Sequence, residues 1–188
     1  LTVGGDYMRD YLMSYQFANN GSKHQYTVDG FAQFDWNPTK YFNVITGLRF
    51  DYYSDSDINH FSPKLGLMYK IGNCSLRGSY AGGFRAPTLK EMYMNFDMAS
   101  IFMIYGNPDL KPETSHNFSL SAEYMKGRYN LTVTGFYNVV DNRITTAWSE
   151  ALKGQVYTNI SNIRISGAEA NASVKYPCGL SARLSYAY

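Results

Sequence analysis

One stretch of this chain, residues 84–113, gathers half of its eight methionines together with several aromatic residues. It reads FRAPTLKEMYMNFDMASIFMIYGNPDLKPE. Thioether and aromatic side chains make soft, adaptable contacts, which suit a large ligand with an irregular apolar surface. The same side chains would also pack the segment against itself, and both interpretations stand at this point. The candidate ligand-contacting residues are Met92, Met94, Phe96, Met98, Phe102, Met103 and Tyr105.

Histidine supplies a second kind of candidate, because imidazole is the commonest metal ligand in proteins. His24, His60 and His116 each fall where a long connection meets a strand-like run. These positions suit a mouth that meets a metal chelate. Polar residues gather in the connections of any protein, however, so the preferred interpretation is that these histidines are ordinary loop residues. Of the three, His60 and His116 join the candidate ligand-contacting residues.

Other chemistry finds no support in the sequence. It contains no phosphate-binding loop, no zinc-type spacing of Cys and His, and no nucleophile elbow. Cys74 and Cys178 belong to turns several strands apart, so we expect two free thiols. A formal net charge of +2 is too small to indicate a nucleic-acid partner. We therefore expect no enzyme, no bound cofactor and no metal site.

The segments that position these residues alternate apolar and polar side chains, which is the period-two pattern of β-strands. Tyr129, Leu131 and Val133, for example, share one phase of such a run. No apolar run approaches the ~18 residues of a helical membrane span. The pattern predicts an all-β protein with strands at 1–8, 25–36, 41–53, 61–70, 74–84, 114–125, 128–140, 157–176 and 180–188.

The connections between these strands alternate strictly in length. The tight ones are NPTK, IGN, KG and PCG, and the longest of the others are 9–24, 85–113 and 141–156. An antiparallel up-and-down meander then has its tight turns at one end and its long connections at the other. This asymmetry is typical of a transmembrane β-barrel, whereas a Greek-key sandwich mixes loop lengths at both ends.

Aromatic residues mark two levels on this meander. Amphipathic rings favour the membrane–water interface, with the apolar body in lipid and the hydroxyl in water. Tyrosine is common in strands generally, but strands of ~10 residues are long enough to cross hydrocarbon, so the girdle interpretation is preferred. The row near the tight turns holds Trp36, Tyr41, Tyr69, Tyr124, Tyr129 and Tyr176, and the row near the long connections holds Tyr26, Tyr52, Tyr80, Tyr137 and Tyr157.

The phase opposite the apolar one carries charged groups, which would face a wet or polar-filled lumen. The lumen-facing candidates are Arg49, Lys64, Arg77 and Glu123. Arg77 and Glu123 lie at the same height above the tight turns, on strands that the meander makes neighbours. We therefore predict that these two side chains pair, either directly or through a group that fills the lumen.

Within 84–113 the sequence TLKEMYM favours one or two helical turns. Thr88 is a suitable N-cap, and Glu91, three residues later, completes a capping box. The following NPDLKP has the chemistry of a turn that returns the chain to a strand. The interruption is therefore expected to be an ordered loop.

Four phrases, in this order, resemble the second half of the barrel of a TonB-dependent outer-membrane receptor. They are SPKLGLMYKIGNCSLRGSYAGGFRAPTLKEMY, GNPDLKPETSHNFSLSAEY, LTVTGFYNVVDNRI and YTNISNIRISGAEANASVKY. The resemblance implies that residues 1–188 are part of a 22-stranded barrel and that 85–113 is a long external loop. It also implies a plug domain and a TonB-binding segment that lie outside this chain.

The FRAP and NPDL boxes resemble the pair that brackets the ligand loop in the haem-receptor branch of this family. In that branch a His between the boxes binds the iron, and here none stands between Pro87 and Asn107. Met98 stands at about the expected place, and a thioether is a possible axial ligand of haem. The cargo therefore stays open among siderophore, haem, cobalamin and glycan.

The resemblance implies a receptor in the outer membrane of a Gram-negative bacterium. Such a receptor imports a scarce nutrient, such as an iron chelate, haem or another large cofactor, with energy delivered through TonB. The expected partners are TonB, outer-membrane lipid and the imported small-molecule cargo. The alternative is a passive porin or a surface-adhesion barrel with the same architecture and no energised transport.

Overall fold

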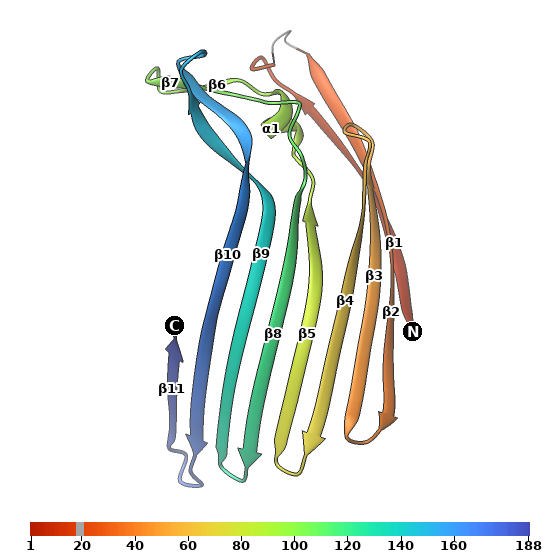
Figure 1. The fold of residues 1–188 in the computed structure, drawn as a ribbon, viewed down its shortest axis with the longest axis vertical. Helices are drawn as coiled ribbons and strands as arrows, with labels where there is room; N and C mark the ends of the chain where they lie inside the picture. Colours follow the sequence, from red (N-terminus) through yellow and green to blue (C-terminus); the bar gives the residue numbers. More distant parts are fainter. Residues whose placement is uncertain (18–20) are drawn as a thin grey trace.

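The computed structural model describes residues 1–17 and 21–188, which form one curved sheet with its long strands side by side (Figure 1). The sheet order is β1-β2-β3-β4-β5-β8-β9-β10, and β11 pairs with β10. Each of these neighbouring pairs is antiparallel, so the predicted meander is confirmed. The strands are β1 (Thr2–Met13), β2 (Ser22–Thr39), β3 (Phe42–Tyr53), β4 (Ile58–Ile71), β5 (Cys74–Arg85), β6 (Phe96–Met98), β7 (Phe102–Tyr105), β8 (Glu113–Lys126), β9 (Tyr129–Ser149), β10 (Gly154–Lys175) and β11 (Ser181–Ala187).

The β9–β10 connection is much shorter than the sequence predicts. β9 runs to Ser149 and β10 begins at Gly154, so the prediction of a loop over 141–156 is wrong. The ladder continues because β-branched residues such as Ile144 keep the extended conformation favourable on both strands. β9 and β10 therefore rise above their neighbours as a tall hairpin (Figure 1).

The β1–β2 connection is shortened in the same way. Strand pairing reaches Met13 on β1 and Ser22 on β2, inside the loop predicted at 9–24. Residues 18–20 of that prediction lie outside the described residues. The strands therefore extend further than predicted toward the end of the sheet opposite the tight turns.

The tight turns all lie at one end of the sheet (Figure 1). Three of them contain a glycine in the left-handed region, where a Cβ would be strained: Gly72 at φ 59°, Gly127 at φ 57° and Gly179 at φ 88°. These residues let the chain reverse within a few positions. The predicted tight turns are confirmed at this end, but at the opposite end only part of the prediction holds: the β5–β8 connection is long, whereas residues 54–57 and 150–153 are short turns.

The two faces of the sheet differ in chemistry because successive side chains point to opposite sides. The outer face carries exposed apolar residues such as Leu48, Leu120 and Leu131 (49%, 68% and 46% exposed). The face that carries Arg49 and Glu123 is called the inner face. Apolar residues that stay exposed over a whole face indicate contact with lipid.

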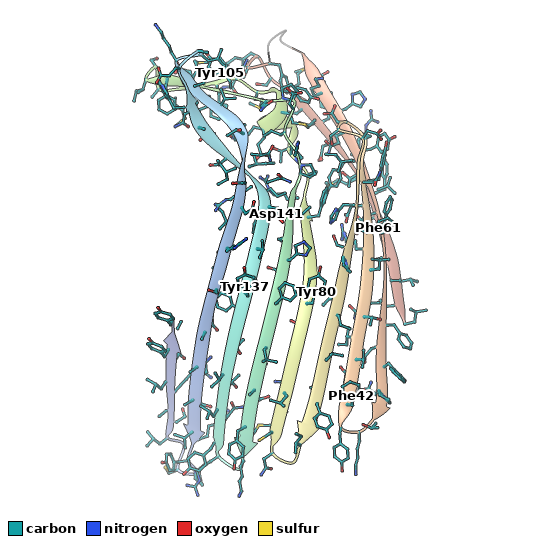
Figure 2. The ribbon with its side chains drawn as sticks, viewed as in Figure 1. Phe42, Phe61, Tyr80, Tyr105, Tyr137 and Asp141 are labelled. Carbon is teal, nitrogen blue, oxygen red and sulfur yellow. The ribbon has the colours of Figure 1, made fainter. Side chains whose placement is uncertain are left out.

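The predicted aromatic rows lie on the outer face, with one exception. Near the tight turns Trp36 is 53% and Tyr129 is 55% exposed, and β9 spans about 27 Å of extended strand between Tyr129 and Tyr137. Tilted as in an outer-membrane barrel, a strand of that length spans about 20 Å, which covers most of the ~25 Å apolar band. Figure 2 shows Tyr137 at mid-height, with Tyr80 level with it. The exception is Tyr157, which the sequence predicts in the row near the long connections but whose ring packs against the core of the β5–β8 connection.

That connection holds the hydrophobic core of the described chain. Its helix α1 spans Leu89–Tyr93, and among the described residues no helix is long and apolar enough to cross a membrane. The buried residues of this core come from the connection and from β9, and partly buried residues of β1 and β10 pack against them. The cluster consists of Leu89, Met92, Leu110 and Ile144, with Leu12, Tyr93 and Tyr157 around it.

Candidate functional site

The connection between β5 and β8, residues 86–112, crosses the end of the sheet opposite the tight turns (Figure 1). On one side it meets the β1–β2 connection, where the Asn95 N–H donates to the Gln16 carbonyl at 3.0 Å. Met94 adds an isolated bridge to Phe17 there. On the other side β7 pairs in parallel with β10. We call residues 86–112 the strap, because they join strands that lie far apart in the sheet.

Arg85, the last residue of β5, holds both ends of the strap. Its Nη1 donates to Glu91 Oε1 of α1 at 3.0 Å, and its Nη2 donates to Glu113 Oε1 of β8 at 2.7 Å. Glu113 Oε1 also accepts the Ile144 N–H of β9 at 2.7 Å. These three charged side chains form the Arg85 clamp, which ties α1 to three strands.

The electrostatics of the clamp keep it ionised. The Arg85 guanidinium lowers the pKa of Glu113 below its ordinary value, the Ile144 N–H lowers it further, and burial opposes both. Hydrogen bonding to Glu113 raises the pKa of Arg85. Because both shifts favour the charged forms, the pair stays intact at neutral pH.

The predicted capping box in α1 is confirmed. Thr88 Oγ1 accepts the Glu91 N–H at 3.2 Å, and Glu91 Oε2 accepts the Thr88 N–H at 2.9 Å. Glu91 therefore fixes the start of the helix and also binds Arg85. At the end of α1, the Lys23 ammonium lies 4.0 Å from the centre of the Tyr93 ring. Burial, together with the neighbouring Asp55 carboxylate, raises the pKa of Tyr93 to about 12, so the ring is a neutral phenol.

The NPDL box fastens the second leg of the strap to β10. Asn107 Nδ2 donates to the Tyr157 carbonyl at 2.9 Å. Asn159 Nδ2 donates to the Lys111 carbonyl and Asn159 Oδ1 accepts the Lys111 N–H, each at 2.8 Å. Leu110 is 6% exposed and lies in the strap core. Both boxes thus position the loop, and their side chains are engaged with protein.

The strap separates the predicted ligand-contacting residues by burial. Met92 is 2% exposed inside the core, so this residue packs the loop and has no surface for a ligand. Met98 lies at the opposite extreme, 44% exposed at the turn between β6 and β7. The others are half-buried along the strap, and Figure 2 shows Tyr105 at the end far from the tight turns. They are Met94, Phe96, Phe102, Met103 and Tyr105.

The exposed end of the strap is an apolar surface that the sequence pattern does not reveal. Ala99 and Ser100 both have positive φ (52° and 59°) in the turn between β6 and β7, which the Ile101 N–H closes by donating to the Met98 carbonyl at 3.0 Å. The ring centres of Phe102 and Trp148 are 6.3 Å apart, with the rings edge to face, so the β9–β10 hairpin lies beside this turn. The apolar tip consists of Met98 and Ile101 of the strap together with Trp148 and Leu152 of the adjoining β9–β10 hairpin, which are 44%, 80%, 55% and 48% exposed.

The two candidate histidines lie on opposite faces. His60 lies opposite Asp51 in the β3–β4 ladder, on the inner face. Its ring stacks on Phe84, with ring centres 4.4 Å apart. His116 lies on the outer face, where its Nδ1 and the Tyr80 hydroxyl are 2.9 Å apart. The structure therefore does not bring the two imidazoles together, and neither belongs to the strap.

The four lumen-facing candidates, Arg49, Lys64, Arg77 and Glu123, all lie on the inner face. Arg77 Nη1 donates to Glu123 Oε2 at 2.8 Å, so the predicted pair is confirmed as a direct contact. Arg49 bridges two carboxylates, Asp29 at 3.1 Å and Asp51 at 2.8 Å. This face therefore presents charged and hydrogen-bonding groups to whatever lies inside the curve of the sheet.

Comparison with known proteins gives a consistent family. The family described as "TonB dependent receptor-like, beta-barrel" matches residues 1–188. The iron-regulated outer membrane virulence protein of Vibrio cholerae serotype O1 is 31% identical over 175 residues, which cover 85% of this chain and 26% of that protein. Hemoglobin and hemoglobin-haptoglobin-binding protein C of Haemophilus influenzae is 38% identical over 90 residues, which cover 47% of this chain and 8% of that protein.

A solved structure shares the fold. The siderophore receptor PirA from Pseudomonas aeruginosa superposes with a TM-score of 0.81 at 21% identity, covering 99% of this chain and 36% of that one. The chain thus spans about a quarter to a third of the relatives that it matches over most of its length. The curved antiparallel sheet, with its apolar outer face and ordered strap, agrees with the family match over residues 1–188. The chain belongs to the β-barrel domain of the TonB-dependent receptors of the Gram-negative outer membrane.

Proposed function

We propose that this chain is the part of a TonB-dependent receptor whose external loop, the strap, contacts the imported cargo, and that the cargo is an iron chelate or haem. The observation that carries this proposal is the strap with its apolar tip. The strap is held at both sides of the sheet, while Ile101 and Trp148 stay 80% and 55% exposed. Large apolar side chains on a rigid, exposed support are typical of binding surfaces.

The class of cargo follows from the chemistry of the tip and from the named relatives. An apolar tip gains about 25 cal/mol for each Å² that a ligand covers, so it favours a ligand with aromatic or macrocyclic surface. The Vibrio relative is named as iron-regulated and the Haemophilus relative as hemoglobin-binding. Ferric siderophores and haem both fit this description.

Haem is the narrower possibility, and Met98 decides it. The strap has no His between Pro87 and Asn107, whereas the Met98 thioether is exposed at the turn and accessible to an iron. Thioether coordination is known for haem iron. Replacing Met98 by Ala would then abolish haem binding and spare ferric siderophores, and equal effects on both cargoes would remove Met98 as a ligand.

Energised import is favoured over passive diffusion because the strap is fixed. The Arg85 clamp and the Asn107 and Asn159 contacts hold it across the end of the sheet. A fixed loop in this position opposes free passage of a large solute. We propose that a plug domain and a TonB-binding segment in the rest of the receptor supply the missing gate and the energy, and that the receptor performs no chemical step on its cargo.

The test is iron-limited growth of a strain in which the full-length receptor is the sole uptake route. A ferric catecholate siderophore and haem serve as separate iron sources, each with TonB present and with TonB inactivated. Growth on at least one source that is lost without TonB supports the proposal. Growth that is independent of TonB would identify a passive barrel, and failure on both sources would contradict the cargo class.

A further inference from the structure

The inner face of β2 carries three successive side chains with an unsatisfied oxygen. Gln25 Oε1, Thr27 Oγ1 and Asp29 Oδ1 are buried and find no hydrogen-bond partner within the described part of the chain. Gln25 and Thr27 are each 5% exposed, and the Asp29 side chain is 9% exposed. Buried polar atoms in folded proteins are nearly always hydrogen-bonded, so three in a line indicate a partner that this chain does not supply.

The surroundings of these oxygens are negatively charged. Strand register places Asp6 opposite Asp29, Asp29 opposite Asp51, and Asp51 opposite His60, so three carboxylates form one row across the inner face. Asp10 lies opposite Gln25 in the same sheet. Like charges directly opposite one another destabilise a sheet unless a counter-charge lies between them.

The counter-charge that bonds this row, Arg49, is already used. The Arg49 guanidinium bonds Asp29 Oδ2 at 3.1 Å and Asp51 Oδ1 at 2.8 Å, which leaves Asp29 Oδ1 free. Asp6 and Asp10 take part in no ion pair among residues 1–17 and 21–188. Among the four carboxylates, two share the Arg49 guanidinium, and the nearby Lys23 and Lys90 form no ion pair with any of them in the described part of the chain.

A cavity gives access to the upper end of this line. It has a volume of about 480 Å³ and lies between the inner face of the sheet and the start of the strap. Asp10, Gln25 and Tyr53 line it on the sheet side, and Pro87 and Lys90 line it on the strap side. A cavity of this size holds a side chain or a small ligand group.

We propose that the inner face of β2 is a binding site for a guanidinium or ammonium group. Asp29 Oδ1 and Thr27 Oγ1 accept hydrogen bonds from the cationic head, and Gln25 Oε1 accepts a further donor of the same ligand. A metal ion fits less well, because the described residues place no group of three metal-binding side chains together. The cation comes from receptor polypeptide outside this chain; a cargo with a cationic group is the other source, but haem and a ferric catecholate carry no such group. With the polypeptide source, the site is independent of the proposed uptake function.

Thr27→Val in the full-length receptor, purified in detergent, tests the site through the sign of its effect. Valine keeps the shape and removes the hydroxyl. If the hydroxyl has no partner, its loss relieves a buried unsatisfied group and the thermal midpoint rises or stays unchanged. If a cation of the receptor polypeptide occupies the site, the midpoint falls. Thr134→Val, on the inner face of β9, is the matched control and is expected to leave the midpoint unchanged.

Arginine amide, added as a guanidinium probe, separates the two sources. With a polypeptide cation in place, Thr27→Val lowers the midpoint and the probe has no effect on the unmodified receptor. With a cargo cation, the probe raises the midpoint of the unmodified receptor and not that of Asp29→Asn. The proposal is overturned when Thr27→Val does not lower the midpoint and the probe also does nothing. Heat-modifiable gel mobility confirms that each variant has a folded barrel.

Discussion

Arg85 and Glu113 are 28 residues apart in the sequence, yet Arg85 Nη2 and Glu113 Oε1 lie 2.7 Å apart where β5 pairs with β8. This contact closes the base of the strap. It explains why a long loop between two neighbouring strands is ordered: both ends of the loop and its helix meet at one guanidinium. The bidentate fork of Arg is suited to joining two carboxylates.

Replacing Arg85 by Gln is expected to loosen the strap and leave the strands paired. The Arg85 side chain is 41% exposed, so solvent screening limits the loss to about 1 kcal/mol. Opening of the strap then becomes about fivefold more frequent, which limited proteolysis or hydrogen exchange of residues 86–112 measures. Arg9→Gln, on the outer face of β1, is the matched control.

Equal protease resistance of the strap in Arg85→Gln and in the Arg9→Gln control would show that the clamp contributes nothing. Arg85→Lys is informative here, because Lys keeps the charge but forms no planar fork between two carboxylates. An intermediate effect of Lys supports the geometric account. An effect equal to that of Gln would also support it, whereas full retention by Lys would reduce the clamp to a point charge.

The clamp is expected to fail in acid. The pKa of Glu113 is lowered from its ordinary value of 4.5, mainly by the Arg85 hydrogen bond. A carboxyl with a lowered folded pKa stabilises the fold above its unfolded pKa and loses that contribution as pH falls through the folded value. Protection of the strap against hydrogen exchange is therefore constant from neutral pH down to about 4.5 and declines below it. Glu113→Gln is expected to remove that part of the acid dependence; an unchanged profile would rule Glu113 out.

Two methionines of the strap are expected to behave oppositely. Met92 is 2% exposed in the strap core, so Met92→Ala costs about 2–5 kcal/mol of local stability through lost burial and a cavity. Met98 is 44% exposed, and Met98→Ala changes stability by about 0.5 kcal/mol or less. Hydrogen exchange of α1 reports both values. Equal effects of the two substitutions would mean that the strap does not pack as described.

The isolated chain of residues 1–188 is not expected to be a soluble monomer. β1 leaves one edge of the sheet unpaired, and the outer face exposes residues such as Leu120 and Leu131 to water. Unpaired edges and large apolar faces drive association. Size-exclusion chromatography without detergent should give aggregate or no recoverable protein. A monodisperse monomer would contradict the assignment of the outer face to lipid.

Local features of this fold could be predicted from the sequence. Strands, tight turns and the Thr88–Glu91 capping box depend on period two, on glycine and on residues three apart. The Arg77–Glu123 pair also followed, because each residue could be counted from a tight turn. The ends of β9 and β10 were misplaced, since pattern alone does not tell a continuing ladder from a polar loop.

The site could not be predicted to the same degree, because burial is a property of tertiary packing. Met92 and Met98 look alike in the sequence, and only packing against Leu89 and Ile144 separates them. The contact of Asn107 with Tyr157 joins residues 50 positions apart, so no local pattern reveals it. The same holds for the unsatisfied oxygens of β2, which depend on strand register.

The central claim is that the apolar tip of the strap contacts the cargo, and equilibrium binding to the full-length receptor tests it most directly. Ile101→Ser with Trp148→Ser removes most of the exposed tip, and Leu120→Ser on the outer face is the control. Each tip substitution is expected to weaken binding of haem or of a ferric catecholate by about 1–2 kcal/mol, or roughly tenfold, with the barrel still heat-modifiable. Unchanged affinity for both cargoes in a folded receptor would contradict the claim.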